Sequence, residues 1–215
     1  MRENALPDAE LRKLVDAVIA ADAATVSRLL AASPDLARAR FQEGATRGNS
    51  QEFYLEQLGR YVLEDDSALH IAATAYNKEI CQILITAGAE IHASNRHGAQ
   101  PLHSAAAGQP GSGRWNPVAQ SATIDVLVVA GADPNAADKR GVTPLHIAVR
   151  TRCASAVQTL LNCGADPARL NKNGSSPVLL ASLTTGRGGS GSPEAKAQQQ
   201  EILQLFEQYA AKVLS

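Results

Sequence analysis

Aromatic residues are scarce in this 215-residue chain, where Phe, Trp and Tyr together make up only 4% of the sequence. A hydrophobic core must therefore consist mainly of Ala, Val, Ile and Leu, which favours closely packed helices. The hydrophobic content of 45% is sufficient for a continuous core and excludes a disordered chain. We predict an all-α protein.

Net charge is also nearly absent, because 20 basic residues face 21 acidic ones. This balance and the few aromatics argue against nucleic-acid binding. No run of 18 apolar residues occurs, so we expect no membrane partner. Glu3, Asp8 and Glu10 interrupt the segment where a signal peptide would need an apolar stretch. We therefore expect a cytoplasmic protein.

Cysteine is infrequent and odd in number, with Cys81, Cys153 and Cys163 each inside an expected helix. This pattern favours reduced, mostly buried thiols over a disulfide framework. Arg150 and Arg152 lie just before Cys153, so a thiol with a lowered pKa and a nucleophilic role is an alternative. A Cys–His pair is not expected there, because His146 lies about 10 Å away along a helix.

Four similar blocks recur in the chain: DDSALHIAA at 65–73, HGAQPLHSAA at 97–106, RGVTPLHIAV at 140–149 and NGSSPVLLAS at 173–182. The steps from Leu69 to Leu102 and from Leu145 to Val178 are both 33 residues. A second helical run follows each of the first three blocks and ends in Gly-Ala, as in ILITAGAE, VLVVAGAD and TLLNCGAD. The glycine suits the position after a helix, where a positive φ is required.

These blocks and their period resemble the ankyrin repeat, and the resemblance covers about four-fifths of the chain. It implies a solenoid of stacked helix-turn-helix units, in which each helix pair buries its apolar face against both neighbours. It also implies protein recognition, without naming a partner. We predict one ankyrin-repeat domain over residues 1–215. Its expected parts are a capping helix pair (8–36), an inserted segment (37–64), repeat 1 (65–97), repeat 2 (98–140, insertion 107–118), repeat 3 (141–173) and a fourth repeat or C-terminal cap (174–215, insertion 184–193).

The family resemblance also implies that His70, His103 and His146 brace the turn before each first helix by hydrogen bonding. Stacked helices lie about 8–10 Å apart, so these histidines cannot share one metal ion. We therefore expect no metal site, no cofactor and no catalytic residues.

Two Gly-rich insertions separate the paired helices of repeats 2 and 4. Asn116-Pro117 and Ser192-Pro193 close them and are typical of a helix start, so each following helix should begin early. One hypothesis is a site for a small anion beside repeat 3, either as a ligand site or as part of an enzyme. Its candidate residues are Arg114, Trp115, Arg150, Arg152, Arg187 and Ser190. The alternative is that the loops are flexible and that the arginines are solvated or pair with Glu194 and Asp125. Trp115 either pins its insertion to the stack or serves as an exposed anchor for a partner.

The inserted segment 37–64 contains a possible short helix after Asn49 or Ser50. Tyr54, Leu58 and Tyr61 would share one helical stripe with Val62. The segment is expected to serve as a lid, a specificity element or additional packing over the concave groove. The leading functional hypothesis is a monomeric adaptor or regulator that binds an unidentified protein partner through this groove. The candidate groove residues are Tyr54, Tyr61, Arg96, His97, Lys139 and Arg140.

Overall fold

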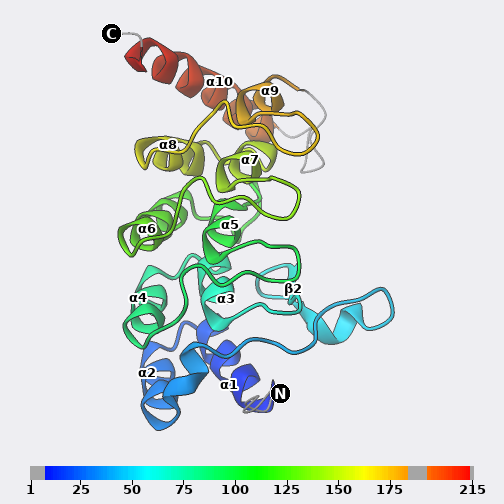
Figure 1. Ribbon diagram of the computed structural model, residues 1–215, viewed down its shortest axis with the longest axis vertical. Coiled ribbons are helices and arrows are strands. Elements are labelled where there is room, and N and C mark those ends of the chain that lie inside the picture. Colours follow the sequence, from blue (N-terminus) through cyan, green and yellow to red (C-terminus); the bar gives the residue numbers. More distant parts are fainter. Residues whose placement is uncertain (1–7, 184–192, 214–215) are drawn as a thin grey trace.

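The computed structural model describes residues 8–183 and 193–213, which form a column of helix pairs (Figure 1). The pairs are α1 (Asp8–Ile19) with α2 (Ala23–Ala32), α3 (Ala68–Thr74) with α4 (Lys78–Thr86), α5 (Pro101–Ala106) with α6 (Pro117–Val129), α7 (Pro144–Arg150) with α8 (Ala154–Asn162), and α9 (Pro177–Ser182) with α10 (Pro193–Val213). The prediction of an all-α repeat solenoid is confirmed.

The helices form two layers, one made of the first helix of each pair and one made of the second. Within the layers α3 packs on α5, α5 on α7, α4 on α6 and α6 on α8. The core between them repeats with the sequence, since Leu69, Leu102 and Leu145 are all fully buried. Such small aliphatic side chains allow the close stacking that the scarcity of aromatics predicted.

Local signals define the repeat helices. In α7, Thr143 caps the first turn and Pro144 is the first helical residue, where a missing N–H costs nothing. Gly88 and Gly131 follow α4 and α6 with φ of +93° and +106°, in the conformation that the Gly-Ala endings predicted.

The bracing role of the three histidines is confirmed. The Ser67 amide donates to His70 Nδ1 at 3.1 Å, so the proton is assigned to Nε2, which donates to the Ala99 carbonyl at 3.0 Å. His103 and His146 make the equivalent bonds to the carbonyls of Val142 and Ser175 in the following repeats. Burial lowers the pKa of all three and brings that of His70 to about 4.

The hairpin tips between repeats are joined to one another by backbone bonds. The amide of Arg96 donates to the Glu64 carbonyl at 2.9 Å, that of Lys139 to His97 at 3.0 Å, and that of Lys172 to Arg140 at 2.9 Å. In Figure 1 these loops follow one another along one side of the column. The tips therefore form a continuous, fixed row.

The expected helix after Asn49 does not form, and that prediction is wrong. A 3-10 turn, η2 (Ser50–Phe53), leads instead into a hairpin of β1 (Tyr54–Leu55) and β2 (Arg60–Tyr61). Tyr54 and Tyr61 lie opposite each other in this hairpin. A helix would have placed Gly59 in its interior at a cost of about 1 kcal/mol, whereas the hairpin turn uses its positive φ of +63°.

Candidate functional site

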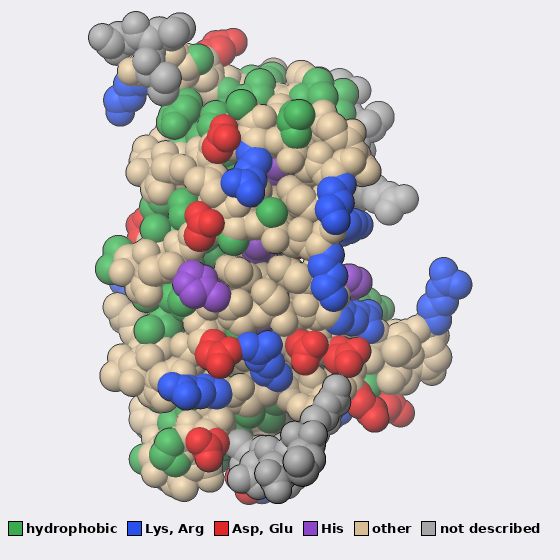
Figure 2. Space-filling view, in the orientation of Figure 1, with side chains coloured by type: hydrophobic (Ala, Val, Ile, Leu, Met, Phe, Trp, Pro, Cys, Tyr) green, Lys and Arg blue, Asp and Glu red, His purple; other side chains and the backbone are tan. Residues whose placement is uncertain are grey.

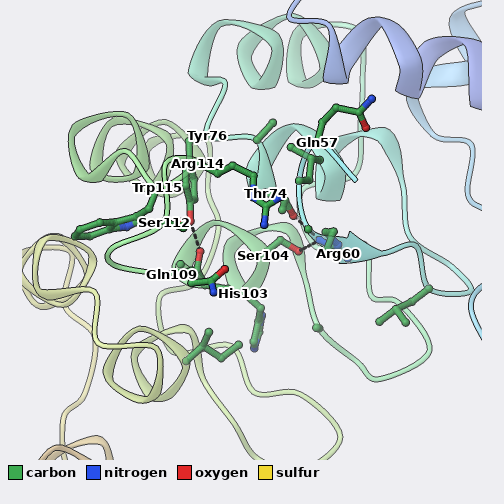
Figure 3. A pocket seen from close by; sticks show the side chains of 18 of the residues that line it. Gln57, Arg60, Thr74, Tyr76, His103, Ser104, Gln109, Ser112, Arg114 and Trp115 are labelled. Atoms are coloured by element: carbon green, nitrogen blue, oxygen red, sulfur yellow. Dashed lines mark hydrogen bonds between the residues drawn. The ribbon is translucent and has the colours of Figure 1, made fainter. Parts of the chain in front are cut away.

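An ion pair with a fully buried carboxylate attaches the inserted hairpin to the first-helix layer. Arg60 Nη2 lies 2.8 Å from Asp66 Oδ2, and the Asp66 side chain is fully buried. Arg60 Nη1 donates to the hydroxyls of Ser104, at 3.1 Å, and Thr74. These hydroxyls belong to α5 and to the last residue of α3, so the hairpin lies directly against both helices (Figure 3).

The Asp66 carboxylate makes further bonds within the protein. It accepts the Leu63 amide at 2.9 Å and Asn95 Nδ2 at 2.9 Å. A carboxylate with this many donors is well compensated for its loss of water. Asp66 therefore joins the inserted segment, the start of repeat 1 and the first hairpin tip.

The insertion of repeat 2 is also held to the stack. Asn116 Oδ1 accepts the Ala119 amide at 3.0 Å and Pro117 begins α6, which confirms the predicted helix start. Trp115 Nε1 donates to Gln120 Oε1 at 2.8 Å, and the buried Gln120 donates to the Ala105 carbonyl at 2.9 Å. Trp115 thus pins the insertion to the stack, which is the first of the two roles expected from the sequence.

The inserted segment 37–64 and the insertion of repeat 2 contact each other, which the sequence did not indicate. Arg114 Nη1 donates to the Glu56 carbonyl at 3.0 Å, and this bond links segments 58 residues apart. Between them lies a cavity of about 380 Å³, which reaches from the hairpin turn to α5 and Trp115 (Figure 3). Its polar lining residues are Gln57, Arg60, Thr74, Tyr76, Asn95, His103, Ser104, Gln109, Ser112, Arg114 and Trp115.

The electrostatics of this cavity depend mainly on Arg114. No Asp or Glu is among the lining residues described, and Arg60 is paired with Asp66. Burial raises the pKa of Tyr76, whose hydroxyl donates to the Ala107 carbonyl. His103 is neutral near pH 7, since burial lowers its pKa. The cavity can accept a small polar group and favours a negative one.

The residues predicted for an anion site beside repeat 3 do not all gather at this cavity. Arg114 and Trp115 line it, whereas Arg150 and Arg152 do not. Arg150 is exposed at the end of α7, and Arg152 is buried in the following turn with a φ of +60°. Arg187 and Ser190, with the predicted cap at Ser192, lie outside the described residues.

The alternative of a reactive Cys153 is wrong. Its thiol is fully buried, and burial raises its pKa to about 11. The neighbouring arginines do not overcome this loss of hydration, so the thiol stays protonated at neutral pH.

The residues predicted for the binding groove lie on the side of the stack that carries the hairpin tips. The rings of Tyr54 and Tyr61 have centroids 4.9 Å apart and are 39% and 46% exposed. In Figure 1 this hairpin lies against the column on the same side as the row of repeat tips. Those tips carry the remaining candidates, of which Arg96 is half-buried and three are exposed: His97, Lys139 and Arg140.

Two searches of the described structure concern metals and membranes. Among residues 8–183 and 193–213, no group of three or more His, Cys, Asp or Glu side chains could hold a metal ion. In the same part of the chain, no helix is both long enough and apolar enough to span a bilayer.

Comparison with known families agrees with the repeats in the structure. The model described as "Ankyrin repeat" matches residues 64–96, and that described as "Ankyrin repeats (many copies)" matches residues 127–181. The chain is an ankyrin-repeat protein, and ankyrin repeats generally mediate protein–protein interaction. A search of curated proteins found no significant match.

Proposed function

We propose that this protein is an adaptor or regulator that binds a protein partner through the side formed by the first helices, the hairpin tips and the inserted hairpin. The observation that carries the proposal is the exposed Tyr54–Tyr61 pair beside the row of basic tips. Tyrosine offers a large contact area with few rotatable bonds and is frequent among residues that dominate binding energy.

The supporting structure makes this side suitable for recognition. Arg60 anchors the hairpin through Asp66, and backbone bonds fix the tips, so little order is lost when a partner binds. A preformed surface of this kind needs no rearrangement to present its side chains.

The test is capture from an extract of the source cells, followed by quantitative binding of the recovered partner. We expect the double variant Tyr54→Ser, Tyr61→Ser to weaken binding by at least about tenfold, the loss of roughly 1.4 kcal/mol. Val129→Ser is the matched control, because Val129 is 89% exposed on α6 in the other layer. Equal binding by the tyrosine variant and wild type, with Arg96→Glu, Lys139→Glu also without effect, would move the site elsewhere.

A second candidate function is the binding of a small anion in the cavity between the inserted segment 37–64 and the insertion of repeat 2. The specific observation is the guanidinium of Arg114 in a cavity of about 380 Å³ whose described lining has no acidic residue. That volume lies within the range of small-molecule sites, about 300–1,000 Å³.

This candidate is tested by thermal shift with phosphorylated and carboxylated metabolites. A ligand should raise the melting temperature of wild type and fail to do so for Arg114→Gln. Arg47→Gln is the control, since Arg47 is an exposed arginine of the same inserted segment outside the cavity lining. Absence of stabilisation, or equal stabilisation in both variants, rejects the candidate.

A further inference from the structure

Three successive hairpin tips carry a cation at the same repeat position. These residues are Arg96, Lys139 and Lys172, and His97 and Arg140 follow the first two. We call this set of five residues the basic ladder. Figure 2 shows basic side chains in a row along the edge of the molecule where the tips lie.

The charge of the basic ladder is not balanced within the tips. Residues 95–98, 138–141 and 171–174 include one acid, Asp138, whose side chain is only 6% exposed. Its Oδ1 accepts the amides of Arg140, at 2.7 Å, and Val142, at 2.9 Å. Its contact with the Arg140 guanidinium is at 4.0 Å, the limit of an ion pair. Asp138 therefore stabilises the turn through its backbone hydrogen bonds and does not neutralise the positive charge of the basic ladder.

The basic residues are also close enough to influence one another. Burial lowers the pKa of His97, and the next largest causes are the charges of Arg96 and Arg140. Lys139 Nζ donates to the Arg96 carbonyl at 2.8 Å, which holds two rungs together. Like charges held side by side destabilise the free protein, and an opposite charge on a partner relieves that repulsion.

The spacing of the rungs limits the shape of an acidic partner. Stacked helices lie about 8–10 Å apart and the tips follow them, so the three cations have this spacing when Lys139 points outward and not to the Arg96 carbonyl. An extended peptide advances about 3.3 Å per residue, so side chains at i, i+3 and i+6 match three rungs. A helix advances about 1.5 Å per residue and needs positions i, i+7 and i+14.

The extended partner orders fewer residues. It spans the basic ladder with about seven residues, and a helix needs about fifteen, while each ordered residue costs about 1–2 kcal/mol. We infer that the basic ladder binds an extended acidic segment of the partner with a carboxylate at every third residue. This inference rests on the proposed function and adds the chemistry of the partner.

The experiment is an NMR titration of the ¹⁵N-labelled full chain at low ionic strength, which detects even millimolar affinity. The probe is a seven-residue Ser/Thr peptide with Glu at positions 1, 4 and 7. Comparison peptides carry three consecutive Glu residues in the same composition, or Glu at positions 1, 8 and 15 of a helical peptide. A seven-nucleotide single-stranded DNA tests whether any polyanion suffices.

We expect the spaced peptide to shift the amides of the three tips and to bind at least about threefold more tightly than the clustered peptide, with affinity falling as salt rises. The double variant Lys139→Gln, Lys172→Gln should weaken it by about fivefold or more. Lys78→Gln should bind like wild type, since Lys78 is an exposed cation on α4 in the other layer.

Several results would overturn the inference: no shift at the tips, equal binding of clustered and spaced peptides, tighter binding of the helical peptide or DNA, or an unaffected double variant. Binding of the captured partner to the variants distinguishes a failure of this inference from a failure of the proposed function. If the partner binds the wild type and loses affinity only through the tyrosine variant, the proposed function holds and the assignment of the basic ladder fails.

Discussion

Gly108 is a residue at which space alone requires glycine. A Cβ built there would lie 2.5 Å from Cys153 Sγ and 2.9 Å from the Trp115 ring. Because Cys153 is fully buried, the backbone at residue 108 must move to relieve the contact with its Sγ, and the Trp115 ring must shift as well. We expect Gly108→Ala to destabilise the fold by about 1–3 kcal/mol and to change the emission of Trp115, the single tryptophan.

Chemical denaturation followed by fluorescence and by circular dichroism measures this effect. Gly113→Ala is the control in the same insertion, because nothing lies within 4 Å of its added Cβ. If the two variants have the same stability and emission, Trp115 is not held in the packing described above.

Gln100 occupies a position where the neighbouring repeats have a hydroxyl. The Ser67 and Thr143 hydroxyls lie 3.0 and 2.8 Å from the histidine Nδ1 of their own repeats. Gln100 Oε1 is buried and has no hydrogen-bond partner among the described residues. Gln100→Thr should therefore raise the free energy of unfolding by about 0.5–1.5 kcal/mol.

Urea denaturation of Gln100→Thr and of the reverse change, Thr143→Gln, provides a matched pair. The two substitutions should shift stability in opposite directions. A loss of stability in Gln100→Thr would show that the longer side chain contributes packing that a hydroxyl does not replace.

At the scale of elements, the sequence predicted the helices whose ends are set by residues close by in the chain. Pro144 and Gly131 mark the start and end of their helices within a few residues, so the repeats and their layers followed from the sequence. The hairpin could not be predicted from the sequence, because it is held by a hydrogen bond from Arg60 to Ser104, which lies on another repeat. The cavity could not be predicted either, since it forms where Arg114 contacts Glu56, 58 residues away in the sequence.

Arg60 determines whether the inserted hairpin stays on the stack. Arg60→Met keeps most of the side-chain volume but leaves Asp66 buried without its cation. Breaking a buried ion pair costs about 3–5 kcal/mol of folding free energy. The cost is smaller here, because the Leu63 amide and Asn95 still donate to the Asp66 carboxylate. We expect lower stability and faster amide hydrogen exchange across residues 53–62, measured by mass spectrometry.

Two comparisons isolate the ion pair. Arg47→Met removes an exposed arginine of the same segment and should leave exchange unchanged. Arg60→Met combined with Asp66→Asn should recover part of the lost stability, since the buried charge is then gone. Unchanged exchange in Arg60→Met would mean that packing of Phe53 and Val62, not the ion pair, holds the hairpin.

At the scale of the whole molecule, stability is distributed over interfaces between neighbours, and the histidines belong to those interfaces. His70, His103 and His146 each join their own repeat to the carbonyl of the next. A change at one of them therefore weakens a junction, and a stack with few repeats has little redundancy. Acid acts on all three junctions together.

The direction of the pH effect follows from the lowered histidine pKa values. The pKa of His70 falls to about 4 in the folded protein because burial disfavours the charged ring, whereas an unfolded histidine titrates near 6.5. Below about pH 6.5 the unfolded chain binds the proton more readily, so stability is full above that pH and is lost as the pH falls toward 4. His70 alone accounts for up to about 3 kcal/mol, and His103 and His146 act in the same direction.

Urea denaturation between pH 7.5 and 4.5 tests this dependence. Wild type should lose stability steadily below about pH 6.5. His70→Asn should be less stable at pH 7.5 but show a shallower loss, because one of the titrating groups has been removed. His92→Asn is the control, since this histidine is exposed on a loop and its variant should retain the wild-type slope. An unchanged slope in His70→Asn would assign the acid sensitivity to carboxylates, and the histidine junctions would then contribute hydrogen bonds without controlling the response to pH.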